Sequence, residues 1–432
     1  MPSPESVSTP RGMRDLKPEE MSLRERILEG IKKVFRLYGF QPLETPALEN
    51  WEVLSAKGAG GDEILNETYN FEDKGGRMLG MRYDLTVPLA RFIAMNPNTP
   101  LPFKRYQIGR VWRYGDVAKG RFREFWQADV DIVGSESMLA DAEVVACAVD
   151  VFIELGFKKF IVRLNDRKIL SAMIRFAGVE EGKVDDAFRA IDKLEKIGEE
   201  KVFEELSQRG IAKEAGKKLM KLLSVKGEPA ELLEEAERLI GGIKEGREGI
   251  EEMRGMIACL KKISSEEYFK VDFSLARGME YYTGPIFEVF FSEGIGSLAG
   301  GGRYDRMIGL FLGKEVPATG ISFGIDRIAE VIGKEYAKAE RSVFVAGVDE
   351  SCGDEVLKVV RNFRNNGIPA MFDLRGRSLA KQLNYANSLK IPYVVIIGKE
   401  EMRQGKVKLR NFASGEEKLL TAEECVELIK NG

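Results

Sequence analysis

The hydrophobic residues near the start of the chain repeat with the period of an α-helix. Within residues 18–38 they form one stripe, made of Leu23, Ile27, Ile31, Val34 and Tyr38, and acidic residues occupy the first turn. A glycine at position 39 suits the end of this helix. The following segment, residues 40–49, alternates apolar and polar positions but contains two prolines. It therefore favours an edge or interface strand over a central one.

Strand-like and helical patterns alternate between residues 76 and 165. Strands rich in Tyr, Trp, Phe and Val are predicted over 76–84, 104–116, 123–134 and 159–165, and helices over 85–95 and 138–156. The turns between the first strands are too short for parallel crossovers. The pattern predicts an antiparallel sheet with flanking helices.

Residues 166–262 differ in character, because they are rich in Lys and Glu and follow a helical period. Strand-like sequence resumes at Val271, so we interpret this segment as a helical module inserted into the first domain. Its alternating charges equally suit a plain solvent-facing bundle.

Residues 342–432 alternate strand and helix patterns, which favours a small α/β domain with a mainly parallel sheet. A capping box, Thr421 followed by Glu424, indicates the start of the last helix. The boundary between domains should fall in residues 334–341. Residues 1–10 are rich in Pro and Ser, and we expect them to be disordered.

The amino-acid composition excludes several classes of catalytic site but says little about the fold. The 432 residues are 44% hydrophobic and 31% charged with a net charge of −3, which is typical of a soluble globular protein. The sequence lacks a signal-peptide core and any apolar run of about 18 residues, so we expect a cytoplasmic location and no membrane contact. The four cysteines are widely spaced and indicate neither disulfides nor a zinc site. Because the chain has no histidine, Ser-His-Asp, Cys-His and imidazole-base mechanisms are excluded.

Two stretches are strongly basic. Between Lys104 and Arg123, seven Lys and Arg residues accompany one acid, and between Arg375 and Arg410 nine accompany two. Such clusters are expected where phosphates bind, and each is equally typical of a solvated basic surface.

Polar residues interrupt an apolar segment at 271–291. Arg277 lies among apolar residues and needs an anion, either Glu280 or a phosphate, whose geometry suits a guanidinium. Two adjacent tyrosines follow it. Further on, three consecutive glycines at 300–302 suit either a ligand lying against the backbone or a glycine-rich turn.

A predicted hairpin carries a second group of charged residues. Its first strand ends at Arg113, and Arg121 and Arg123 follow the loop. The return strand offers Gln127, Asp129 and Asp131 on one face, because alternate residues of a strand share a face. Opposite charges on paired strands suit either ion pairs or a ligand that carries both charges.

These segments resemble the three signature motifs of class II aminoacyl-tRNA synthetases. The matching features are the helix and strand ending at Pro46, the hairpin GRVWRYGD to GRFREF, and the strand-to-helix segment GIDR with Arg327. LARGMEYYTG and AGGGRYD are similar to the two motifs particular to the histidyl-tRNA synthetase family, and the resemblance runs from about residue 11 to the C-terminus.

The resemblance implies an α+β fold with several domains. An antiparallel-sheet catalytic domain would comprise residues 11–165 and 263–333, with a helical insertion domain at 166–262. An α/β anticodon-binding domain would comprise residues 342–432. The implied reaction makes histidyl-adenylate from histidine and ATP and transfers the histidine to the 3'-terminal adenosine of tRNA(His).

The resemblance also implies roles for single residues. For ATP, Arg113 and Arg327 would bind the α- and γ-phosphates, Arg277 would contact the α-phosphate, adenine would lie on Phe125, and the remaining contacts would come from Gly300, Gly301 and Gly302. Mg²⁺ would accompany the β- and γ-phosphates. For histidine, the ammonium group would be held by Asp84, Thr86 and Gln127, the imidazole nitrogens by Asp131 and Tyr282, and the pocket would be lined by Tyr281 and Tyr304.

Partners follow from the same resemblance. Lys119 and Arg121 would contact the acceptor stem of the tRNA, and the basic segment that includes Arg377 would contact the anticodon. The family is dimeric through its first motif, so we expect a homodimer. The alternative is a non-catalytic paralogue, like the regulatory subunit of ATP phosphoribosyltransferase, which should lack the ATP-binding arginines and the C-terminal domain.

Overall fold

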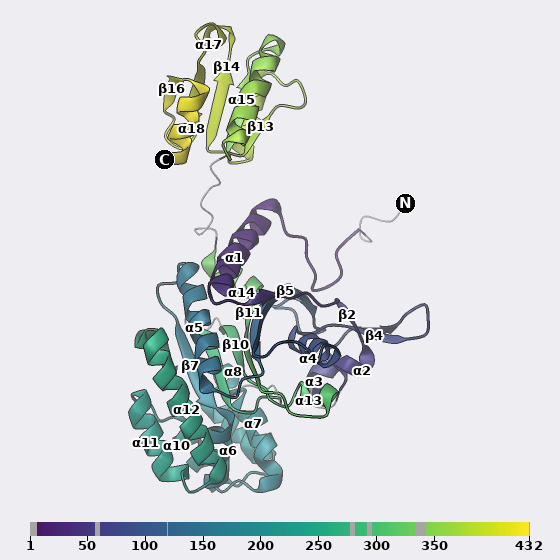
Figure 1. Cartoon of the computed structure of the whole chain (residues 1–432), viewed down its shortest axis with the longest axis vertical. Helices are drawn as coiled ribbons and strands as arrows, with labels where there is room; N and C mark the ends of the chain where they lie inside the picture. The colour runs from purple at the N-terminus through teal and green to yellow at the C-terminus, as the bar shows by residue number, and fades with distance from the viewer. Residues whose placement is uncertain are drawn as a thin grey trace. The chain divides into compact units, whose positions relative to one another are not determined.

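The computed structural model describes residues 7–56, 61–118, 120–276, 281–291, 296–333 and 342–431. The chain divides into two compact units, residues 1–333 and 334–432, and each has hydrophobic cores of its own (Figure 1). No helix in the described part of the chain is long and apolar enough to cross a membrane. All four cysteines are free thiols.

An eight-stranded sheet forms the centre of the first unit. Its strands lie in the order β1 (Gln41–Pro42), β5 (Phe103–Trp112), β6 (Glu124–Val133), β11 (Ala318–Gly324), β10 (Ser297–Arg303), β9 (Pro285–Phe290), β7 (Ile161–Asp166) and β8 (Phe269–Val271). The pairs from β5 to β7 are antiparallel, and only the edge pairs β1–β5 and β7–β8 are parallel. The antiparallel sheet predicted from the short turns is therefore confirmed.

Three helices cover one face of this sheet: α1 (Pro18–Leu37), α5 (Met138–Glu154) and α14 (Ile325–Ile332) (Figure 1). The apolar stripe of α1 packs into the core that these helices share with the sheet. On β6, Ala128, Val130 and Ile132 enter the same core. The alternate residues of β6 therefore face the other side of the sheet, where the candidate site lies.

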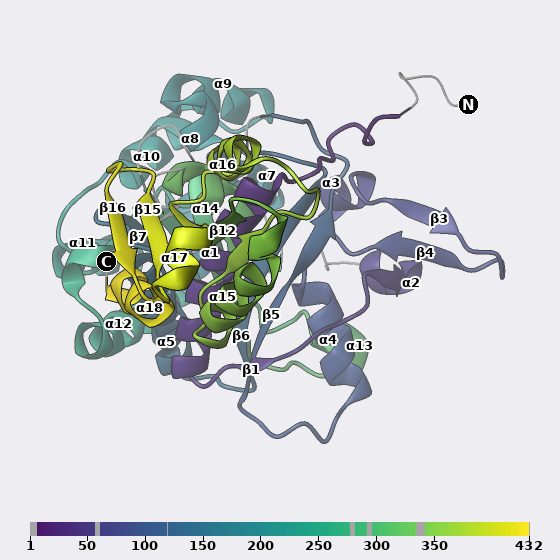
Figure 2. The same ribbon diagram turned by 90° about the horizontal axis from the view of Figure 1, so that it is seen from above.

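Smaller elements border that other side. They are α4 (Thr86–Met95), α13 (Gly309–Leu312), the short helices α2 (Trp51–Leu54) and α3 (Gly61–Asn66), and a three-stranded sheet of β2 (Leu48–Asn50), β4 (Met78–Met81) and β3 (Asn70–Glu72). Figure 2 shows β3 and β4 extending away from the large sheet. Strands β5 and β6 pair along their whole length, and a hairpin loop joins them.

The Lys- and Glu-rich segment is helical throughout its described length. It contains α6 (Arg167–Phe176), α7 (Val184–Ile191), α8 (Leu194–Ile197), α9 (Glu199–Gln208), α10 (Lys213–Leu223), α11 (Pro229–Ile240) and α12 (Lys244–Ile263), with 3-10 turns at Glu181–Lys183 and Glu266–Tyr268. Helix α12 packs against α5, and buried residues of these helices join the same core as α1 and α5. Apolar packing is thus continuous between this segment and the sheet.

The second unit contains a five-stranded sheet in the order β13 (Ala370–Phe372), β12 (Val343–Gly347), β14 (Tyr393–Ile397), β15 (Val407–Asn411) and β16 (Glu417–Leu420). Its helices are α15 (Gly353–Asn365), α16 (Leu379–Ser388), α17 (Lys399–Arg403) and α18 (Ala422–Asn431), with a 3-10 turn at Glu350–Cys352. The sheet is mixed: β13, β12 and β14 pair in parallel, as predicted, whereas β14–β15 and β15–β16 pair antiparallel, which the prediction did not include. The loop between β15 and β16 is too short for a parallel crossover. The predicted capping box is confirmed: the backbone N–H of Thr421 donates to Glu424 at 2.7 Å, and that of Glu424 to the Thr421 hydroxyl at 3.2 Å.

Candidate active site

A cavity of about 320 Å³ lies on the face of the sheet opposite α1 and α5. It is lined by residues of the β5–β6 hairpin, the start of α4, strands β10 and β11, and the start of α14. A chamber of about 30 Å³ adjoins it, and the two spaces share the lining residues Thr86, Asp129, Tyr281, Tyr282, Gly300 and Ser322. Segments far apart in the sequence therefore meet at one site.

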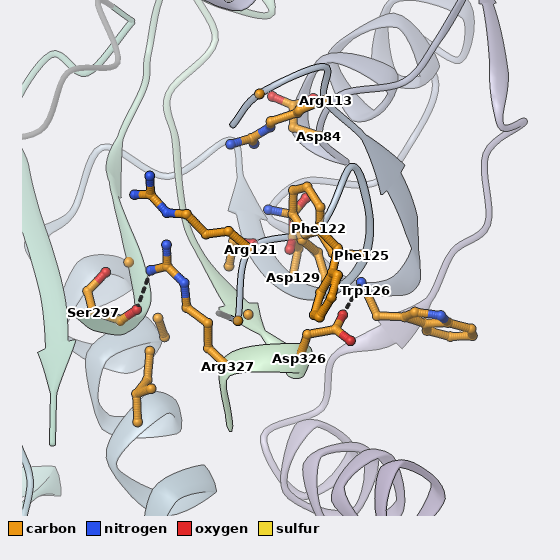
Figure 3. A pocket seen from close by; sticks show the side chains of 18 of the residues that line it. Asp84, Arg113, Arg121, Phe122, Phe125, Trp126, Asp129, Ser297, Asp326 and Arg327 are labelled. Carbon is orange, nitrogen blue, oxygen red and sulfur yellow. Dashed lines mark hydrogen bonds between the residues drawn. The ribbon is translucent and has the colours of Figure 1, made fainter. Parts of the chain in front are cut away.

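Three guanidinium groups share this cavity. Arg113 follows the end of β5, Arg121 belongs to the hairpin loop and Arg327 to the first turn of α14, and their side chains extend into the same space in Figure 3. Arg113 Nε donates to the carbonyl of Tyr83 at 2.9 Å, and Arg327 Nη1 to that of Ser297 at 2.8 Å. These bonds fix the side chains, so their charges are held in place to meet an anion.

Aromatic rings of the hairpin lie beside the guanidiniums. The Arg113 guanidinium lies over the ring of Phe125, 5.4 Å from its centroid, and Phe122 lines the same cavity. Asp326, next to Arg327, accepts a hydrogen bond from the backbone N–H of Trp126 at 2.9 Å and pairs with the buried Arg24. This carboxylate ties the start of α14 to β6 (Figure 3) and so fixes the position of Arg327 relative to the hairpin.

Acceptor groups concentrate toward the inner end of the cavity. Asp84 precedes α4, and its Oδ1 accepts from the backbone N–H of Val87, in the first turn of the helix, at 3.1 Å. Burial raises the pKa of Asp84 to about 6. Thr86, in the first turn of α4, and Gln127, on β6, line the cavity beside it. The structure thus brings together all three residues predicted for the ammonium group.

The inner chamber contains a buried cluster around Asp131. Arg105 on β5 forms an ion pair with Asp131, with 2.8 Å between Nη2 and Oδ2, and the Tyr304 hydroxyl donates to Asp131 Oδ1. Burial raises the pKa of Asp131 while Arg105 opposes the rise. Gly320 lies opposite Asp131 on β11, and a Cβ there would collide with the carboxylate. The chamber therefore exists because this position carries no side chain.

Tyrosine rings form much of the remaining wall. Tyr281 and Tyr282 are buried and line both the cavity and the chamber. Their ring centroids are 4.7 Å apart, and the ring of Tyr281 lies 6.0 Å from that of Tyr304, edge to face. A small planar ligand could therefore contact aromatic rings and a carboxylate together.

The three consecutive glycines on β10 lack a side chain for different structural reasons. Gly300 lines both the cavity and the chamber, and Gly301 lines the chamber. A Cβ on Gly301 would lie 2.7 Å from Cα of Ile321 on the neighbouring strand, and one on Gly302 would lie 2.8 Å from the Tyr282 ring. Gly302 is not among the lining residues. Strand packing therefore accounts for Gly302 and partly for Gly301, whereas Gly300 lines both spaces.

Of the remaining expected residues, one lies in the second unit and two lie outside the described residues. Arg277 and Lys119 lie outside the described residues. Arg377 belongs to the second unit, where its Nη1 lies 3.4 Å from Asp373 Oδ1 and its guanidinium 4.1 Å from the centroid of the Tyr385 ring. Arg121, expected at the acceptor stem, lines the cavity with Arg113 and Arg327.

Sequence reasoning gave no role to two residues of the site. Arg105 is fully buried against Asp131, and Asp129 lines both the cavity and the chamber. Burial raises the pKa of Asp129 to about 7. A signal for Asp129 was present, because it shares a strand face with Gln127 and Asp131.

Comparison with known proteins gives a consistent result. The family described as histidyl-tRNA synthetase matches residues 12–328, and the family described as anticodon binding domain matches residues 342–432. A histidine-tRNA ligase of Aeropyrum pernix is 41% identical, over 98% of this chain and 97% of its own length. One of Korarchaeum cryptofilum is 42% identical, over 93% and 94%. The crystal structure of histidyl-tRNA synthetase from Nostoc sp. PCC 7120 is 32% identical with a TM-score of 0.87, and the match covers 98% of this chain and 99% of that one.

These matches decide between the two interpretations of the motifs. The curated relatives named histidine-tRNA ligase match over nearly the whole chain, including the C-terminal unit, so the regulatory paralogue is not favoured. The cavity agrees, since it retains Arg113 and Arg327. The chain therefore belongs to the histidyl-tRNA synthetase family, the enzymes that activate histidine with ATP and join it to tRNA(His).

Proposed function

We propose that the cavity binds ATP across the hairpin and that the inner chamber holds histidine. The observation that carries the proposal is the continuity of the two spaces: fixed guanidiniums line the outer part, and a buried carboxylate and tyrosines line the inner part. Phosphates would therefore lie beside the amino acid they activate.

For ATP, we assign the α- and γ-phosphates to Arg113 and Arg327 and the adenine to the face of Phe125. Arg121 is a further candidate for the phosphates, because it lines the same cavity. Arg277 would contact the α-phosphate where histidine attacks. Guanidiniums suit these roles because their charge is permanent and their donors match phosphate oxygens.

For histidine, we assign the ammonium group to Asp84, Thr86 and Gln127 and the imidazole nitrogens to Asp131 and Tyr282. Tyr281 and Tyr304 would enclose the ring. The Tyr304 hydroxyl and Arg105 both contact Asp131, so they would also orient the carboxylate that reads the imidazole. Leaving such buried groups unpaired costs about 1–3 kcal/mol each, which would reject apolar rings of the same shape.

The chemistry needs positioned charge rather than a protein base. In the first step the histidine carboxylate attacks the α-phosphorus, the bond to the bridging oxygen breaks, and pyrophosphate leaves. The guanidiniums would stabilise the negative charge that develops on the phosphate oxygens. In the second step the terminal adenosine hydroxyl of the tRNA attacks the carbonyl carbon, and AMP leaves while its phosphate takes the hydroxyl proton.

Magnesium is compatible with this cavity. Mg²⁺ in nucleotide sites is commonly held by one or two carboxylates together with phosphate oxygens. Glu67 and Asp116 are carboxylates on the cavity wall that could contribute. No group of three or more acids and cysteines gathers for a metal within the described ranges, so the phosphates would supply most of the ligands. Bound there, the ion would neutralise phosphate charge.

We extend the proposal to the rest of the chain from its family. Residues 11–165 and 263–333 would form the catalytic domain, 166–262 the insertion and 342–432 the anticodon-binding domain, with a homodimer that works in the cytoplasm. Exposed apolar residues beside the first motif support a partner there, since Leu37 and Leu48 are 76% and 42% exposed. The tRNA contacts of Lys119, Arg121 and Arg377 remain part of the same proposal.

The decisive measurement is ATP-pyrophosphate exchange with each of the twenty amino acids. Exchange driven by histidine alone is expected, and exchange driven by no amino acid, or by a different one, would reject the assignment. Arg113→Ala should reduce exchange about 100- to 1000-fold, as loss of a fixed charge at the reacting group does. Arg110→Ala is the matched control, because Arg110 lies on β5 close to Arg113 in sequence but pairs with Glu124, and its side chain is 53% exposed.

Arg277→Ala tests the role of the arginine in the tyrosine motif. We expect adenylate formation to be lost while histidine binding, measured by calorimetry, is largely retained. Normal turnover in this variant would remove Arg277 from the reaction.

A further inference from the structure

The inner end of the cavity contains three buried aspartates, and only one of them is assigned to the imidazole. Asp84, Asp129 and Asp131 are all buried, with at most 3% of each residue exposed. The charge of Asp131 is matched by the ion pair with Arg105. Asp84 and Asp129 lie near each other, and neither forms an ion pair within the described residues, although the charge of Arg113 acts on Asp84. Two buried acids without an ion pair favour a cationic ligand.

The other buried guanidinium near Asp129 is that of Arg82, which is hydrogen-bonded to backbone carbonyls. Arg82 donates from Nε to the carbonyl of Arg110 at 3.0 Å and from Nη1 to that of Thr45 at 2.6 Å. It therefore attracts the Asp129 carboxylate only through its charge, without binding it. Asp129 keeps acceptor capacity for something else.

Three acceptor oxygens face this space without a partner. Among the acids and amides that line the cavity in the described ranges, Asp84 Oδ2, Gln127 Oε1 and Asp129 Oδ1 are buried and accept no hydrogen bond from the protein. An ammonium group carries three N–H donors. The number of acceptors equals the number of donors, and two of the three carry the charge that an ammonium group needs.

Strand geometry accounts for the position of Asp129. It lies two residues from Gln127 on the same face of β6, opposite Ser322 on β11 and Gln107 on β5. The Gln107 amide is bound to the Thr45 hydroxyl at 3.0 Å. Asp129 is thus presented to the cavity between the residue assigned to the ammonium group and the one assigned to the imidazole.

We propose that Asp129 is a further histidine-binding residue, which accepts a hydrogen bond from the α-ammonium group together with Asp84 and Gln127. This inference rests on the proposed function. It gives the three acids different roles, because Asp84 and Asp129 would bind the ammonium group while Asp131 binds the imidazole. A charge-assisted bond of this kind is worth about a 10- to 100-fold change in affinity.

The test compares ligands that differ in the ammonium group. Dissociation constants of wild type and Asp129→Asn are measured by calorimetry for histidine, histidinol and 3-(imidazol-4-yl)propionate. The last of these keeps the imidazole and the carboxylate but lacks the ammonium group. We expect Asp129→Asn to weaken histidine and histidinol about 10- to 100-fold and to leave imidazolylpropionate within about twofold.

Asp131→Asn is the matched control. It should weaken all three ligands, because all three contain the imidazole. If Asp129→Asn also weakens all three equally, Asp129 acts on the imidazole or on the fold, and the proposal is wrong. If it weakens none, Asp129 does not bind histidine. Should Asp129→Asn not fold, Asp129→Ala is measured with the same ligands and judged by the same pattern.

The wild-type protein separates this inference from the function on which it rests. If the wild-type protein fails to bind histidine, the proposed function fails. If it binds histidine and the Asp129 variants bind equally well, only the role of Asp129 fails. The melting temperature and the affinity for ATP of each variant report whether the rest of the cavity is intact.

Discussion

Replacing Arg105 by methionine should destabilise the first unit strongly. Arg105 is fully buried, pairs with Asp131 at 2.8 Å and donates to the carbonyl of Leu85 at 3.0 Å. Methionine keeps most of the aliphatic volume but removes the charge. Asp131 would then keep only the hydrogen bond from the Tyr304 hydroxyl, in an interior that disfavours its ionised form.

The size of the effect follows from the burial of both partners. Removing one member of a buried ion pair costs about 3–5 kcal/mol, because the other charge stays behind unpaired. The first unit spans residues 1–333. At about 2.1 cal/mol/K per residue its unfolding entropy is about 0.7 kcal/mol/K, so the melting temperature should fall by about 4–7 °C.

Scanning calorimetry of the full chain measures this shift, with the transition of the first unit followed in each variant. Arg110→Met is the control, because the Arg110 side chain is 53% exposed and its pair with Glu124 should contribute less than about 1 kcal/mol. Adding Asp131→Asn to Arg105→Met should restore much of the loss, since no charge is then left buried. A melting temperature within about 1 °C of wild type for Arg105→Met, or a double variant no more stable than the single one, would refute the reasoning.

Two further predictions concern the same face of the sheet. Gly301→Ala should lower the free energy of unfolding by at least about 1–3 kcal/mol, because its Cβ would meet the backbone of β11. Gly242→Ala is its control in the same unit, since a Cβ there meets nothing within 4 Å, and equal melting temperatures would count against the prediction. Burial, with Asp131 and Asp84 adding and Arg105 opposing, raises the pKa of Asp129 to about 7, whereas an unfolded aspartate has a pKa of about 3.9. The folded protein therefore binds the proton of the Asp129 carboxyl more tightly than the unfolded chain does. The contribution of this proton to the free energy of unfolding is complete below about pH 4 and is lost as the pH rises through about 7. Asp129→Asn should flatten urea-unfolding stability between these limits, and an unchanged slope would contradict the pKa assignment.

Much of the site could be predicted because it follows from the two-residue period of a strand. Gln127, Asp129 and Asp131 share parity, and Ala128, Val130 and Ile132 enter the core on the opposite face. The short loop of the hairpin fixed the antiparallel pairing of β5 and β6 in the same way. Local rules of this kind need no knowledge of the rest of the fold.

Arg105 could not be assigned by those rules. Its role depends on facing Asp131 across the β5–β6 pair, which requires the register of the hairpin and not only its existence. A shift of one residue would turn the side chain of Arg105 to the opposite face of the sheet. The loop sequence does not define its turn type closely enough to exclude that shift. In the sequence, Arg105 is therefore one basic residue among seven.

Local sequence rules also could not show why each glycine lacks a side chain, because the reason depends on contacts with other strands. A missing side chain can make room for a ligand, for a neighbouring strand or for another side chain, and these cases look alike in sequence. Here Gly302 makes room for Tyr282, while Gly320 makes room for the Asp131 carboxylate. The position of that carboxylate thus depends on a glycine nearly 190 residues away in sequence that pairs with it from the neighbouring strand. Gly320→Ala should consequently impair histidine binding more than any change of similar size on the core face of β6, because it displaces the group that the ligand would contact.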